Sequence, residues 1–70
     1  GGDRFYDVLA RLERDPANNI ELLEFMYMCL SLGFDGRLRV EPGGADKHLR
    51  IREGLARIIR GQRGPVEADL

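Results

Sequence analysis

The apolar segment LLEFMYMCLSL, residues 22–32, constrains the fold of this chain more than any other feature. On a helical wheel of about 100° per residue, its apolar side chains and that of Ile20 cover about two-thirds of the circumference. Only Glu21, Glu24 and Ser31 form a narrow polar strip. A helix of this kind must be buried on more sides than two small neighbours can cover. We therefore expect it either to self-associate or to pack against additional helices.

Both ends of this segment carry helix signals. Asn18, with Glu21 three residues later, is a plausible capping box at the start. Gly33 stands where a left-handed residue ends a helix, and Phe34 can fold back on the last turn. The sequence therefore predicts a helix over about residues 19–32.

Two amphipathic segments flank this helix and complete an all-α, three-helix unit. The first predicts a helix over about residues 3–14 and the last a helix over about residues 46–60, each with one apolar stripe. Gly54 lies beside the apolar stripe of the last helix, where it would allow another helix to approach closely. The residues expected to form the structural core are Leu23, Phe25, Tyr27, Leu30, Leu32, Gly33, Phe34, Leu55 and Ile58.

Composition limits the chain to one small globular domain. Hydrophobic residues make up 43% and charged residues 33% of the 70 positions, which is typical of a folded domain. The single cysteine, Cys29, excludes an internal disulfide. No apolar run is long enough to span a bilayer.

The residue types that perform catalysis are not arranged for it. Cys29 lies in the apolar segment without a histidine at a recognisable spacing, and His48 is the only histidine. No phosphate-binding, nucleophile-elbow or metal-ligand motif is present. We therefore predict no enzyme and no catalytic, cofactor-binding or metal-binding residues.

The charges are unevenly distributed along the chain. Residues 1–35 carry three arginines against seven acids, whereas residues 36–70 carry eight basic residues against five acids. A basic second half could belong to a helical DNA-binding module, but the loop before the last helix is too long for a helix-turn-helix. A solvated helix face is the simpler interpretation, and we predict no nucleic-acid partner. The DNA-binding module and an independent homodimeric adaptor remain the alternatives.

Three stretches carry a family resemblance: GGDRFYDVLARLERDP, LLEFMYMCLSLGFDGRLRV and HLRIREGLARIIRGQRG, together about residues 1–64. The most specific positions are Leu22-Leu23-Glu24, Tyr27, Cys29-Leu30, Leu32-Gly33-Phe34, Gly36-Arg37 and Arg39. With this pattern the chain resembles the DotU/TssL (IcmH-like) family of type VI secretion systems, which has relatives in type IVB systems. Leu38 and Gly54 depart from the pattern, which has a tyrosine and a longer residue at these places.

The resemblance implies a structural role. Family members have a helical-bundle cytoplasmic domain followed by a C-terminal membrane anchor, at the cytoplasmic face of the bacterial inner membrane. By resemblance, residues 1–64 are the C-terminal helical part of this domain, and residues 65–70 lead toward an anchor that this chain lacks. Such proteins self-associate, pair with a TssM/IcmF-like membrane protein and dock the baseplate. Arg37 and Arg39, in the predicted loop, are available to carboxylates of a partner.

Overall fold

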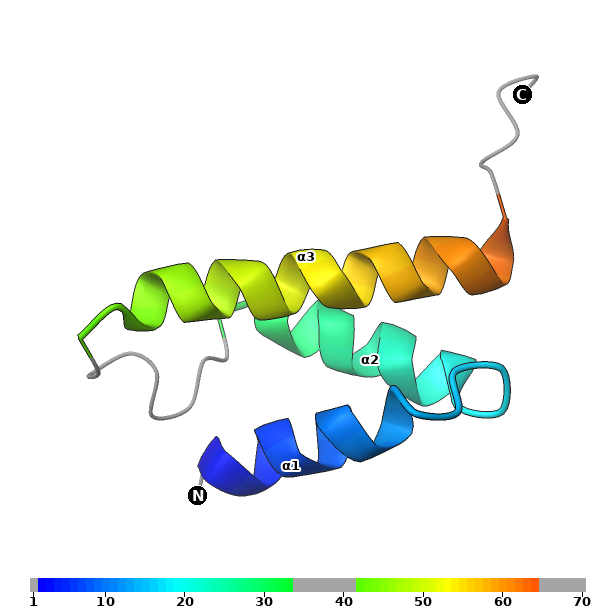
Figure 1. Ribbon diagram of the computed structural model, residues 1–70, viewed down its shortest axis with the longest axis horizontal. Helices are drawn as coiled ribbons and strands as arrows, with labels where there is room; N and C mark the ends of the chain where they lie inside the picture. Colours follow the sequence, from blue (N-terminus) through cyan, green and yellow to red (C-terminus); the bar gives the residue numbers. More distant parts are fainter. Residues whose placement is uncertain (1, 34–41, 65–70) are drawn as a thin grey trace.

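The computed structural model describes residues 2–33 and 42–64, which form three α-helices (Figure 1). Helix α1 spans Gly2–Leu12, α2 spans Ile20–Ser31 and α3 spans Gly44–Arg63. The described residues contain no strand. The prediction of an all-α, three-helix unit is confirmed.

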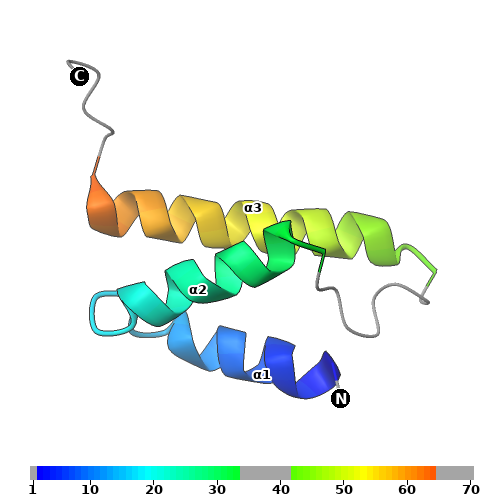
Figure 2. The same ribbon diagram turned by 180° about the vertical axis from the view of Figure 1, so that it is seen from behind.

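Helix α2 lies between the other two helices in both views (Figures 1 and 2). Its backbone approaches that of α3 more extensively than that of α1. Within the described part of the chain, the backbones of α1 and α3 do not approach each other. The apolar segment therefore forms the central helix of the unit.

The core is small and lies where the three helices meet. Leu23, Leu30 and Leu55 are fully buried, and Leu9 and Met26 nearly so. Further apolar side chains from all three helices are partly buried against this cluster: Phe5, Tyr6, Leu12, Tyr27, Ile51, Ile58 and Ile59. Every helix therefore contributes apolar side chains to one common cluster.

Phe25 and Leu32, which we expected in the core, are exposed. The side chain of Phe25 is 57% exposed and that of Leu32 is 80% exposed. On the wheel they lie on the side of α2 opposite Leu23 and Leu30, and neither α1 nor α3 covers that side. The assignment of Phe25 and Leu32 to the core is therefore wrong for the described structure, because the two neighbouring helices pack on the other side of α2.

The capping box expected at the start of α2 does not form. Asn19, not Asn18, is the N-cap residue, and its side chain makes no capping hydrogen bond. Instead the Asn19 amide donates to the carbonyl oxygens of Asp15, at 3.0 Å, and Leu12, at 3.3 Å. The Asn18 amide donates to the Asp15 carboxylate at 2.9 Å. Both asparagines thus brace the turn after α1 through local side-chain hydrogen bonds to Asp15.

Gly33 ends α2 as predicted. Its φ is +109°, a conformation that an L side chain rarely adopts. Its N–H donates to the carbonyl oxygen of Leu30 at 3.1 Å, which satisfies one of the last carbonyls of the helix. Phe34, predicted to fold back on this end, lies outside the described residues.

Helix α3 is longer than predicted at both ends. It begins directly after Gly43, so Asp46 lies in its first turn, where a carboxylate is favourable to the helix dipole. It also continues through Gly61 to Arg63, and Gly64, whose φ is +79°, is its C-cap residue. A glycine inside a helix lowers the stability of the helix but does not necessarily end it. Tertiary contacts of the following turn can offset this loss of stability.

Gly54 does not mark a close helix contact among the described residues. A methyl group added at this position would meet no atom within 4 Å. The expected close approach of another helix is therefore not seen, and Gly54 costs α3 backbone entropy without a packing benefit in the described structure.

Truncating a core leucine should unfold much of the population. Leu55→Ala removes a fully buried side chain from the centre of a small core, and such truncations cost about 2–5 kcal/mol. In a domain of this size, the hydrophobic core rarely supplies more than about 3–5 kcal/mol of stability. Urea denaturation followed by circular dichroism measures the loss. The matched variant Leu32→Ala, at an exposed site, should change stability by less than about 0.5 kcal/mol, and equal losses would refute the assigned core.

Replacing Gly54 with alanine should stabilise the chain by about 0.5–1 kcal/mol, because alanine has the higher helix propensity and the space is open. Gly33→Ala is the matched control, and it should destabilise the chain because of the positive φ. The same denaturation experiment measures both. A destabilising Gly54→Ala would show that the glycine is needed for a contact.

Candidate functional site

One exposed surface of the molecule is the side of α2 that faces away from the core. It carries Leu22, Phe25, Met28 and Leu32, all of them exposed. Their spacing of three or four residues places them along one side of the helix, and we call them the outer face of α2. Cys29, half-buried, lies beside this face.

The outer face explains the apolar surplus of α2. Leu23, Met26 and Leu30 point into the core on the opposite side of the same helix. The helix therefore has two apolar sides, of which α1 and α3 cover only one. Large apolar side chains gathered on one exposed helix side are typical of a surface that binds protein.

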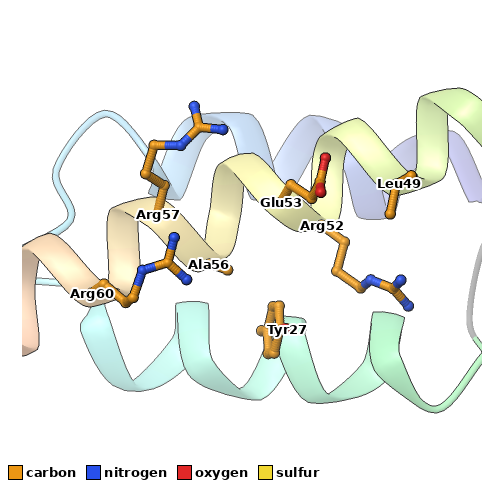
Figure 3. A pocket seen from close by; sticks show the side chains of 7 residues that line it. All are labelled: Tyr27, Leu49, Arg52, Glu53, Ala56, Arg57 and Arg60. Carbon is orange, nitrogen blue, oxygen red and sulfur yellow. The ribbon is translucent and has the colours of Figure 1, made fainter. Parts of the chain in front are cut away.

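A second surface is a groove between α2 and α3 (Figure 3). Tyr27 of α2 lines one wall, and α3 supplies the rest, namely Leu49, Arg52, Glu53, Ala56, Arg57 and Arg60. We call this the α2–α3 groove. Arg52 and Arg60 lie to either side of Tyr27 in the close-up, with Ala56 between them.

The α2–α3 groove is positively charged. Three arginines and one glutamate line it. Within the described ranges, none of Arg52, Arg57 and Arg60 is held by an ion pair or a side-chain hydrogen bond. These guanidinium groups are therefore available to an anionic ligand.

A second groove lies between the end of α1 and α3, where Glu13, Arg50, Gly54 and Arg57 are among the lining residues. Partial burial raises the pKa of the Glu13 carboxyl. Since Arg57 lines both grooves, its side of α3 separates them.

Glu24 and Arg63 connect α2 to the last turn of α3. The Arg63 guanidinium donates two hydrogen bonds to the Glu24 carboxylate, at 2.8 Å from Nε and 2.7 Å from an Nη. This bidentate geometry fixes the relative position of two residues that are far apart in the sequence. The hydrogen bonds lower the pKa of Glu24 and raise that of Arg63.

The residues considered for chemistry and for partner contact are placed as follows in the described part of the chain. No group of three metal-ligating side chains exists among the residues with described positions. His48 is half-buried, and its Nδ1 has no hydrogen-bond partner in the described part of the chain. Arg37 and Arg39, predicted to contact partners, lie outside the described residues. No described helix meets the length and hydropathy needed to cross a membrane.

Sequence reasoning did not identify the α2–α3 groove. One signal was available, because Arg52, Ala56 and Arg60 are spaced four residues apart and share one side of α3. The contribution of Tyr27 could not be derived from spacing, since it depends on how α2 packs against α3.

Over the described residues, the fold and these surfaces define a class: an all-helical unit with an exposed apolar helix side and a basic groove. A family model described as "Type VI secretion system protein DotU" matches residues 1–70, the whole chain. The chain belongs to the DotU family and is thus a component of type VI secretion, as the resemblance implied. Searches of curated proteins and of solved structures each gave no significant match.

The Glu24–Arg63 pair should make stability depend on pH in the acidic range. Because the pKa of Glu24 is lowered in the folded state, the unfolded chain binds the proton first as pH falls. The stabilisation is complete above the pKa of unfolded Glu24 and is lost as pH falls through the lowered, folded value.

A carboxyl titration by NMR measures this pKa. Arg63→Gln should raise it toward the ordinary glutamate range and weaken the loss of stability in acid. Arg57→Gln removes the same charge from α3 without touching Glu24 and should leave the titration nearly unchanged. An identical Glu24 pKa in all three proteins would contradict the assigned pair.

Proposed function

We propose that the chain is a non-catalytic structural component of a type VI secretion membrane complex. In this proposal, residues 1–64 are the C-terminal part of a larger helical-bundle domain at the cytoplasmic face of the bacterial inner membrane. Residues 65–70 lead toward a membrane anchor. Family membership supports the assignment to secretion, and the outer face of α2 supports the larger domain.

The outer face of α2 is the observation that carries the proposal. Phe25 and Leu32 are each more than half exposed, and burying a side chain of this size is worth about 1.5–3 kcal/mol. The proposed occupants of this face are further helices of the same domain. They would bury the apolar surface that α1 and α3 leave open and would make α2 a central helix.

The proposed partners are those that the family resemblance implies: a TssM/IcmF-like membrane protein, baseplate proteins and further copies of the protein. Arg37 and Arg39 remain proposed contacts for carboxylates of such partners, on the strength of the sequence alone. A DNA-binding module has less support, since residues 32–43 separate α2 from α3 where a helix-turn-helix has about three or four.

The test compares the 70-residue chain with a chain extended in both directions. The double variant Phe25→Ser, Leu32→Ser should change the stability of the 70-residue chain by less than about 0.5 kcal/mol per site, because both side chains are exposed. In the extended chain it should cost several kcal/mol, on the order of 2–4 per site, because the side chains would be buried there. Denaturation curves measure both effects.

Val8→Ser is the matched control, since Val8 is an exposed apolar residue on α1, away from the outer face. It should have little effect in either chain. Sedimentation gives a second measurement, in which the 70-residue chain should associate with rising concentration and the double variant should not. A stable monomer with cooperative melting, equally sensitive in both lengths, would contradict the larger domain.

The role in secretion is tested in cells that lack their own copy of the gene. Full-length protein with Phe25→Ser and Leu32→Ser should fail to restore type VI secretion, whereas Val8→Ser should restore it. Restoration by the double variant would show that the outer face is not needed for assembly.

A further inference from the structure

We propose that the α2–α3 groove binds an acidic helix of a partner protein, with two carboxylates about two turns apart and an apolar residue between them. The groove is formed by Tyr27 and by side chains of α3 that include Arg52, Ala56 and Arg60. This surface is distinct from the outer face of α2, so its assignment does not depend on the larger domain proposed above.

The spacing of the two arginines defines the ligand. Arg52 and Arg60 are separated by eight positions on one helix, which is about 12 Å along its axis at about 1.5 Å per residue. On a ligand helix, side chains about two turns apart lie at nearly this separation and on one side. Two carboxylates spaced in this way can each meet one guanidinium.

The part of the groove between the two arginines, formed by Ala56 and Tyr27, favours a ligand helix with an apolar residue at its centre. Ala56 lies between Arg52 and Arg60 on α3, and Tyr27 lies opposite them on α2 (Figure 3). The small alanine leaves room for a side chain from the ligand, and the tyrosine ring offers it an apolar surface. A helix is a suitable ligand for a groove because helices pack by placing side-chain ridges into grooves.

The charges favour a protein carboxylate over a phosphate-rich surface. Glu53 also lines the groove, and it would repel a dense array of phosphates at close range. A peptide with two spaced carboxylates can avoid Glu53 while pairing with the guanidinium groups of Arg52 and Arg60, which have no ion-pair partner among residues 2–33 and 42–64. Charge complementarity therefore selects an acidic helix as the occupant.

The experiment titrates the 70-residue chain with a fluorescent, alanine-based helical peptide that carries two glutamates about two turns apart and one leucine between them. Binding is followed by fluorescence anisotropy. Arg52→Gln and Arg60→Gln should each weaken binding by roughly threefold to tenfold, and added salt should weaken it further. Arg50→Gln is the matched control, because Arg50 lines the other groove and carries the same charge. It should change the affinity by less than twofold, roughly.

Two further measurements keep the test decisive. A peptide of the same composition with its glutamates adjacent should bind markedly less well. Amide shifts of Tyr27 and Ala56 in the unmodified chain should move when the spaced peptide is added, a result that needs no variant.

Four outcomes would overturn the proposal. The first is equal loss of binding in the Arg50 variant, and the second is equal binding of the two peptides. The third is binding to phosphatidylserine vesicles that depends on Arg52 and Arg60 while the acidic peptide does not bind. The fourth is self-association that Arg52→Gln abolishes, which would assign the groove to a second copy.

Discussion

The packing of α2 against two helices at once is the interaction on which the rest of the structure depends. Because the described parts of α1 and α3 do not approach each other through their backbones, each is held mainly by its contact with α2. Leu23 and Leu30 of α2 meet Leu9 from α1 and Leu55 from α3 in one cluster. A helix that serves two neighbours needs a wide apolar side, and this requirement accounts for part of the apolar excess of residues 22–32.

The remainder of that excess determines what the molecule can bind. Phe25 and Leu32 contribute little to the described core, so the packing of these three helices does not explain why they are apolar. An exposed apolar side chain of this kind lowers the stability of an isolated chain only slightly. When a partner buries the side chain, its removal from water stabilises the complex. Under the proposed function, the outer face of α2 is a contact surface whose burial would stabilise the larger domain.

Periodicity predicts the three helices because an amphipathic stripe fixes both the presence of a helix and the side that it buries. That reasoning succeeds for Leu55 and Ile58 of α3, where one side is apolar. It fails to orient α2, since a helix that is apolar around most of its circumference can be buried on any side. The error at Phe25 and Leu32 follows directly from this ambiguity. The end of α2 at Gly33 was predictable because the required backbone conformation favours glycine.

The capping prediction at Asn18 failed for a local reason. The side-chain amides of Asn18 and Asn19 donate instead to the carboxylate and the carbonyl oxygen of Asp15, three and four residues earlier. The α2–α3 groove, in contrast, joins segments that are distant in the sequence, because it depends on the position of Tyr27 beside α3. The two candidate surfaces differ in the physical force that each would use. Contacts at the apolar outer face should persist as salt increases, because apolar burial is not screened, whereas contacts at the arginines of the groove should weaken. The dependence of complex formation on ionic strength therefore separates the two surfaces within one assembly.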